Sequence, residues 1–282
     1  MDATDFWLPV VVVILGNALF FFYCQYKKDN SYIDALWGLT FLSPLLSLII
    51  KRYASDTPDP DARCWLVAAL VGIWGVRLCL HILKRHRGED FRYKKMREDW
   101  TEKGGGYCGY LWRAFVYVFM LQGIFSLICN SAGLYVEIYS TSDLIWLDFV
   151  GLAVWIFGFV FEVIGDYQLK VHIADKTPGK KKFINSGLWQ YTRHPNYFGE
   201  ATLWWGIYLI ACSVEWGWIT VWAPAFITYL VRFLSGVPML EEKYKGNPEW
   251  EAYCAQVNVF VPWFPNRKAA APANQETLVG TV

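Results

Sequence analysis

Charged residues are scarce in this sequence of 282 residues, at 18% of the chain, against about 25% in a typical soluble domain. Apolar residues make up 55%, and aromatic residues alone 18%. The charges gather in short segments between long apolar runs. This distribution excludes an ordinary soluble domain and predicts a polytopic membrane protein. The net charge of +1 gives no reason to expect a nucleic acid as a partner.

Cysteine and histidine motifs for metals and redox groups are also lacking. The seven cysteines form no C-x-x-C pair, so neither a zinc site nor a thioredoxin-like pair is indicated. The histidines are too few for the histidine boxes of membrane di-iron enzymes; they are His81, His86, His172 and His194. We therefore predict no metal site.

Long apolar runs predict seven membrane-spanning helices, because a helix needs about 20 mostly apolar residues to cross a bilayer. The candidate spans are residues 6–26, 33–50, 64–83, 111–136, 144–165, 199–213 and 216–236. The sixth is short, and Pro224 near the middle of the seventh predicts a kink. We expect an all-α protein in which residues 1–265 form a single membrane-embedded domain and residues 266–282 a disordered tail.

Loops rich in lysine and arginine alternate with loops that have none. Residues 84–103 contain eight and residues 170–193 contain six, whereas the loops after the fourth and sixth predicted spans contain none. The positive-inside rule then predicts an outside N-terminus and a cytosolic C-terminus. The membrane that we expect is the endoplasmic reticulum or another internal membrane. The exception is the loop after the second span, where Lys51, Arg52 and Arg63 are offset by nearby aspartates.

A polar, basic and aromatic stretch separates the fifth and sixth predicted spans. Residues 185–200 read N-S-G-L-W-Q-Y-T-R-H-P-N-Y-F-G-E. Ionisable residues at membrane depth are costly and are candidates for a functional site. Pro195 suits the first turn of the sixth helix, which would place the residues after it near backbone N–H groups that favour anions. The candidate binding residues are Arg193, His194, Asn196, Tyr197 and Glu200.

Three ionisable residues at the end of the fifth predicted span share one helix face. Glu162, Asp166 and Lys170 are spaced i, i+4, i+8. Two interpretations are open: a salt-bridge ladder that ends at Lys170, or one side of a site that continues into residues 185–200. We favour the site, because a carboxylate inside a bilayer must be paired or line a wet cavity. The basic loops nearby suit a phosphate-bearing cofactor.

Residues 187–200, from G-L-W-Q-Y-T-R-H-P to N-Y-F-G-E, resemble the C-terminal signature of the steroid 5α-reductase-like membrane proteins. The chain is most similar to the subfamily labelled as a domain of unknown function (DUF1295). Further segments that fit this subfamily are Trp74-Gly75-Val76-Arg77, residues 88–93 (G-E-D-F-R-Y), Phe161-Glu162 with Asp166, and residues 243–246 (K-Y-K-G) with Trp250 and Tyr253. The resemblance covers about residues 30–265.

The resemblance implies a helical membrane fold whose C-terminal half, about residues 144–265, binds NADPH. It also implies hydride transfer to a polarised carbon–carbon double bond of a sterol- or lipid-like substrate that enters from the bilayer. Asp166 and Asn196 are expected to contact the cofactor. The further cofactor-binding candidates are Glu162, Lys170, Arg193, His194, Tyr197, Glu200, Arg232 and Tyr253. The candidates for the catalytic acid are Asp34 and Tyr93.

Two alternatives remain open at this point. The isoprenylcysteine and phospholipid methyltransferases share the Arg-His-Pro-x-Tyr core and bind S-adenosylmethionine. Their acceptor sites often follow a closing Glu-Glu pair, and Glu241-Glu242 stands in a comparable place here. The basic loop 170–182 and the Asp166 face favour NADPH instead. The other alternative is a non-catalytic membrane subunit, which an open pocket at Asp166, Asn196 and Glu200 would argue against.

Overall fold

The computed structural model describes residues 3–103 and 105–266, and all regular secondary structure within these ranges is helical. The helices η2 and η5 are π-helical, and the other η segments are 3-10 turns. In chain order the elements are η1 (Ala3–Phe6), α1 (Trp7–Lys27), α2 (Tyr32–Tyr53), α3 (Ala62–Arg85), α4 (Phe91–Lys103), α5 (Gly106–Arg113), η2 (Ala114–Met120), α6 (Leu121–Cys129), α7 (Ser131–Tyr139), α8 (Trp146–Ala174), η3 (Gly187–Gln190), α9 (Pro195–Ala211), η4 (Gly217–Val221), α10 (Trp222–Tyr229), η5 (Leu230–Leu234), α11 (Val237–Glu241), η6 (Glu242–Tyr244) and α12 (Pro248–Gln256).

The all-α membrane class is confirmed. Helical segments among the described residues that are long and apolar enough to cross a bilayer are Thr4–Lys27, Tyr32–Tyr53, Ala62–Arg85, Gly106–Cys129, Trp146–Ala174 and Gly217–Tyr244. They match six of the seven expected spans. The remaining one corresponds to α9, whose 17 residues rise about 26 Å, slightly less than the ~30 Å hydrocarbon core. Pro224 lies in the first turn of α10, where a missing backbone N–H costs little.

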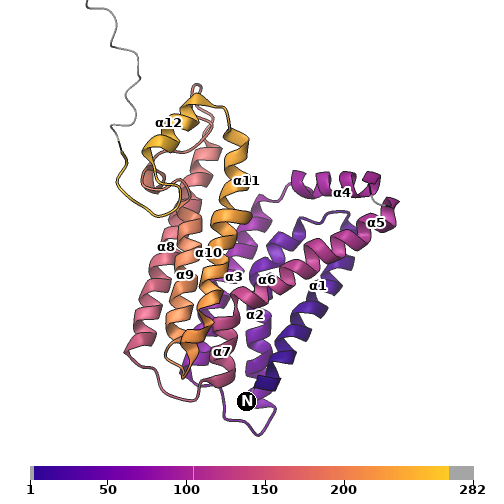
Figure 1. Ribbon diagram of the computed structural model, residues 1–282, viewed down its shortest axis with the longest axis vertical. Helices are drawn as coiled ribbons and strands as arrows, with labels where there is room; N and C mark the ends of the chain where they lie inside the picture. Colours follow the sequence, from indigo (N-terminus) through magenta and orange to yellow (C-terminus); the bar gives the residue numbers. More distant parts are fainter. Residues whose placement is uncertain (1–2, 104, 267–282) are drawn as a thin grey trace, which may run out of the picture. The chain divides into compact units, whose positions relative to one another are not determined.

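The described chain divides into two compact units, which are considered separately below. Unit 1 comprises Met1–Ala153 and Trp205–Phe226, and unit 2 comprises Val154–Trp204 and Ile227–Val282. Within unit 1, Figure 1 shows α4 lying crosswise to α1 beside the start of α5. The disordered tail expected at residues 266–282 lies, except for Asn266, outside the described residues.

Close helix packing in unit 1 depends on glycine. A Cβ atom added to Gly38 on α2 would lie 2.4 Å from the carbonyl oxygen of Gly75 on α3, so the two backbones touch at this crossing. Small residues allow this approach, which is the usual means of packing helices inside a bilayer. Beside the crossing, the rings of Phe41 and Trp74 meet edge to face, 5.2 Å apart.

A buried ion pair joins α3 to the start of α8 in unit 1. The side chains of Arg63 and Asp148 are both fully buried, and Arg63 Nε and Nη2 donate to the two Asp148 oxygens at 2.8 and 2.9 Å. Arg63 also donates to the Ser140 hydroxyl at 2.9 Å and to the Asp143 carbonyl at 2.7 Å. The charge of Arg63 is therefore neutralised inside the protein, which accounts for part of the exception in the loop-charge pattern.

Unit 2 also packs through small residues, here between α8 and α9. A Cβ on Gly158 would meet the Leu203 backbone nitrogen at 2.5 Å, and one on Gly199 would meet the Glu162 backbone nitrogen at 2.5 Å. A separate aromatic cluster of Phe183, Trp250 and Tyr253 packs the C-terminal segment. The tight α8–α9 contact brings the polar residues of both helices together.

Candidate functional site

Asp34 and Tyr93, the two candidates for the catalytic acid, meet in unit 1. Asp34 lies in the first turn of α2 and Tyr93 in the first turn of α4. The phenol of Tyr93 donates a hydrogen bond to Asp34 Oδ1 at 2.5 Å. The second carboxylate oxygen accepts a hydrogen bond from Arg92 Nη2 at 2.9 Å. The contact between the two acid groups therefore joins the start of α2 to the start of α4.

Neighbouring polar groups hold this pair in position. Arg92 Nε donates to Asp90 Oδ1 at 2.8 Å, so one guanidinium links two carboxylates. Gln122 Nε2 on α6 lies 3.4 Å from the Tyr93 oxygen. Burial and the nearby charge of Asp34 raise the pKa of Tyr93 well above its usual value. Tyr93 is thus a neutral phenol that can donate a proton or a hydrogen bond.

In unit 2, Arg193 and His194 are held by one carboxylate. Arg193 Nε and Nη2 donate to the two Glu241 oxygens at 2.8 and 3.2 Å, and Nη1 donates to the carbonyls of Cys254 and Val257. His194 Nε2 lies 2.9 Å from Glu241 Oε1. All three nitrogens of Arg193 are therefore engaged within the protein, so its guanidinium anchors the start of α9 to α11 and the C-terminal segment.

Among the described residues, the second nitrogen of the His194 ring, Nδ1, has no hydrogen-bond partner. Burial lowers the pKa of His194 despite the hydrogen bond to Glu241, so the ring is neutral near pH 7. The bond to a carboxylate places the proton on Nε2. Nδ1 is then a buried acceptor, without a hydrogen-bond partner among the described residues. The Tyr197 ring stacks on His194 with ring centres 5.7 Å apart.

Asp166 and Asn196 form a second polar contact between α8 and α9. Asn196 Nδ2 donates to Asp166 Oδ1 at 3.1 Å. Gly165 permits this approach, because a Cβ there would lie 3.0 Å from the Asn196 backbone nitrogen. Asn196 Oδ1 is buried and has no hydrogen-bond partner in the described part of the chain. The helix α9 begins at Pro195, as the sequence predicted.

The remaining candidates of unit 2 have different surroundings. Glu162 is buried on the same face as Asp166, whereas Lys170 is exposed and has no ion-pair partner within residues 105–266. The salt-bridge ladder ending at Lys170 is therefore absent from the described structure. Arg232 lies over the Phe233 ring at 4.7 Å, and the Tyr253 hydroxyl donates to the Trp189 carbonyl. Tyr253 is thus a structural contact of η3.

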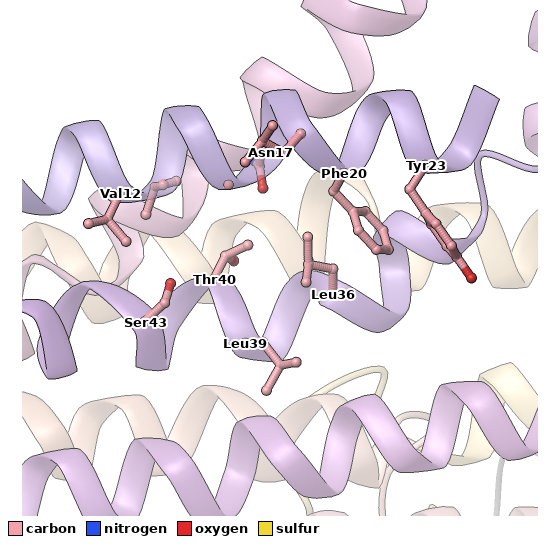
Figure 2. Close-up of a pocket in the computed structure, with 11 residues that line it drawn as sticks. Val12, Asn17, Phe20, Tyr23, Leu36, Leu39, Thr40 and Ser43 are labelled. Carbon is pink, nitrogen blue, oxygen red and sulfur yellow. The ribbon is translucent and has the colours of Figure 1, made fainter. Parts of the chain in front are cut away.

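A cavity of about 520 Å³ lies elsewhere, between α1 and α2 in unit 1. Figure 2 shows residues of the two helices facing each other across it. Its lining residues are Val12, Val13, Gly16, Asn17, Leu19, Phe20, Tyr23, Leu36, Leu39, Thr40 and Ser43. Asp166, Asn196 and Glu200 are not among these lining residues. The cavity is therefore not the pocket expected at those three residues, and it leaves the non-catalytic alternative open.

Comparison with known proteins identifies the family. The model of the family described as "Protein of unknown function (DUF1295)" matches residues 20–257. The chain belongs to this family. It is 24% identical over 274 residues to an uncharacterized protein of Schizosaccharomyces pombe, an alignment that covers 88% of this chain and 77% of the relative. No solved structure matches the chain.

Three residues at the Asp34–Tyr93 pair and the cavity were not among the site residues predicted from the sequence. Arg92 and Gln122 contact the Asp34–Tyr93 pair, and Arg92 stands inside the motif segment 88–93, so its neighbour Tyr93 could have indicated it. Gln122 has no such signal. Asn17, an amide near the middle of the apolar first span, is the signal that could have indicated the cavity.

Proposed function

We propose that this protein is a membrane oxidoreductase that uses NADPH to reduce a carbon–carbon double bond of a lipid-like substrate. The observation that carries the proposal is the hydrogen bond of 2.5 Å between Tyr93 and Asp34, held by Arg92. Paired acid groups of this kind are rare within an apolar bundle and are by default candidates for chemistry.

The pair can act on a carbonyl that is conjugated to the double bond. NADPH, when bound, would supply a hydride to the far carbon of that bond, and the negative charge that this puts on the carbonyl oxygen would need a hydrogen-bond donor. A buried phenol stabilises such charge by donating a hydrogen bond. The Tyr93 O–H, which donates to the Asp34 carboxylate in this structure, would turn to the carbonyl oxygen and pass its proton to the enolate. Water would then reprotonate the phenolate, and Asp34 would accept the phenol proton again and so orient Tyr93. Arg92 keeps Asp34 in place throughout.

The residues of unit 2 are suited to the sugar or carboxamide groups of the nucleotide. Asn196 Oδ1 and His194 Nδ1 are buried acceptors without partners among the described residues, and acceptors bind hydroxyl or amide N–H groups. The exposed Lys170 and the half-buried Arg232 carry charge for its phosphates. Arg193 is not assigned to a phosphate, because Glu241 and backbone carbonyls occupy its nitrogens.

Nucleotide binding to the protein in detergent tests this assignment. We expect Asn196→Ala to weaken NADPH binding about tenfold, the effect of losing one buried hydrogen bond and stranding its partner. Asp166→Ala should act in the same direction. Tyr167→Ala is the matched control, because Tyr167 is the neighbour of Asp166 and is 66% exposed. Equal affinity in all three variants would remove Asp166 and Asn196 from the cofactor site.

A further inference from the structure

The cavity between α1 and α2 is an uncharged groove that opens away from the protein interior. None of its lining residues carries a charge. Gly16 is exposed, and a Cβ atom there would meet nothing within 4 Å. The volume of about 520 Å³ lies within the usual range for small-molecule sites, about 300–1,000 Å³. Both helices are among the membrane-spanning segments, so the groove faces hydrocarbon.

Asn17 is the one amide in the lining, whose other polar groups are the hydroxyls of Tyr23, Thr40 and Ser43. Asn17 is fully buried, and its Nδ2 donates to the Phe119 carbonyl of the π-helix η2 at 2.8 Å. Its Oδ1 has no hydrogen-bond partner among the described residues. Figure 2 shows this oxygen on the side of α1 that faces α2. An unpaired buried acceptor is costly, so a ligand that donates a hydrogen bond here would be favoured.

The depth of Asn17 restricts the ligand. It lies ten residues before Lys27, the last residue of α1, which is a rise of about 15 Å and about half of the ~30 Å hydrocarbon core. A charged group would be costly at this depth, whereas a hydroxyl can be accommodated by one hydrogen bond. The donor must therefore be an uncharged group carried on hydrocarbon.

The groove lies against the hydrophobic cluster that contains Tyr93. Leu36, one of its lining residues, follows Asp34 by two positions and packs against the hydrophobic cluster that contains Tyr93. Phe20, on the opposite wall, packs against the same cluster. A lipid lying in the groove would thus contact residues that pack on the cluster containing Tyr93.

We propose that the α1–α2 groove binds an uncharged lipid that bears a hydroxyl group, and that Asn17 Oδ1 accepts a hydrogen bond from this hydroxyl. The proposal rests on the proposed function in one respect: it names the chemical class of the substrate. The binding site itself requires neither NADPH nor turnover.

Photolabelling of the full-length protein in liposomes tests this site. The probes are a long-chain alcohol that carries a diazirine and the methyl ether of the same alcohol. We expect the alcohol to label peptides of α1 and α2 at a concentration about three- to tenfold lower than the ether, the effect of one hydrogen bond. Asn17→Leu should remove this preference, and Gly16→Phe should prevent labelling by both probes.

Leu15→Phe is the matched control, because it adds the same ring at an exposed neighbour that does not line the groove. It should label like the wild type. If Asn17→Leu does not fold, the two probes on the wild type and on Gly16→Phe still decide. Equal labelling of the wild type by alcohol and ether, or unchanged labelling of Gly16→Phe, would overturn the proposal. All labelling is done without NADPH, so failure to bind nucleotide would affect only the proposed reaction.

Discussion

The buried ion pair of Arg63 and Asp148 allows a strong test of the packing in unit 1. Asp148→Ala leaves a fully buried guanidinium without its carboxylate. Removing one partner of such a pair costs about 3–5 kcal/mol. The change also removes the acceptor for the Ile145 backbone N–H, 2.7 Å from Asp148 Oδ2, at about 1 kcal/mol for a lost cap. We expect a large decrease in thermal stability.

The assay is thermal unfolding in detergent, followed by intrinsic tryptophan fluorescence. Lys245→Ala is the control, because it removes an exposed ion pair with Glu242 and should change little. The double variant Arg63→Met, Asp148→Leu should recover much of the lost stability, since it leaves no unpaired buried charge. If Asp148→Ala unfolds at the same temperature as Lys245→Ala, or the double variant is no more stable than the single one, the reasoning fails.

Three further predictions concern single side chains. Gly38→Ala should destabilise the protein by about 1–3 kcal/mol through overpacking. Gly72→Ala should be tolerated, since its Cβ would meet only a flexible leucine side chain at 3.4 Å. The unfolding temperatures of the two variants are compared with that of the wild type. Glu241→Gln should destabilise unit 2 by about 1.5–3 kcal/mol, the value of hydrogen bonds to a charged group, while Glu242→Gln, at an exposed position, should have no measurable effect. Tyr93→Phe should lower the reduction rate about 10²–10³-fold, as expected for one donor to a developing oxyanion, with unchanged NADPH affinity; a rate within twofold of the wild type would contradict its role.

Much of the membrane architecture follows from apolar runs alone. Runs near 20 residues long predicted the spanning helices, and Pro195 predicted the start of α9, because these signals are local. The short α9 is held by glycine contacts with α8, which no hydropathy pattern reveals. The burial of Arg63 was likewise hidden, since its partner Asp148 is 85 residues away.

The candidate sites likewise depend on contacts between residues far apart in the sequence. The pairing of Asp34 with Tyr93 spans 59 residues, and their candidacy came from resemblance and not from spacing. Arg193 was a cofactor-binding candidate in the sequence, which gives no sign of its partner Glu241, 48 residues further on. The groove beside Gly16 depends on how two helices diverge, and a sequence pattern carries no information on that distance.

Native mass spectrometry of the purified protein, with NADPH and S-adenosylmethionine added at equal concentration, tests the central claim most directly. Both cofactors offer ribose hydroxyl groups to Asp166 and Asn196, but NADPH alone brings phosphates for Lys170 and Arg232. The account predicts a complex with NADPH that is lost in Asn196→Ala and retained in Tyr167→Ala. A complex with S-adenosylmethionine alone would contradict it and indicate a methyltransferase.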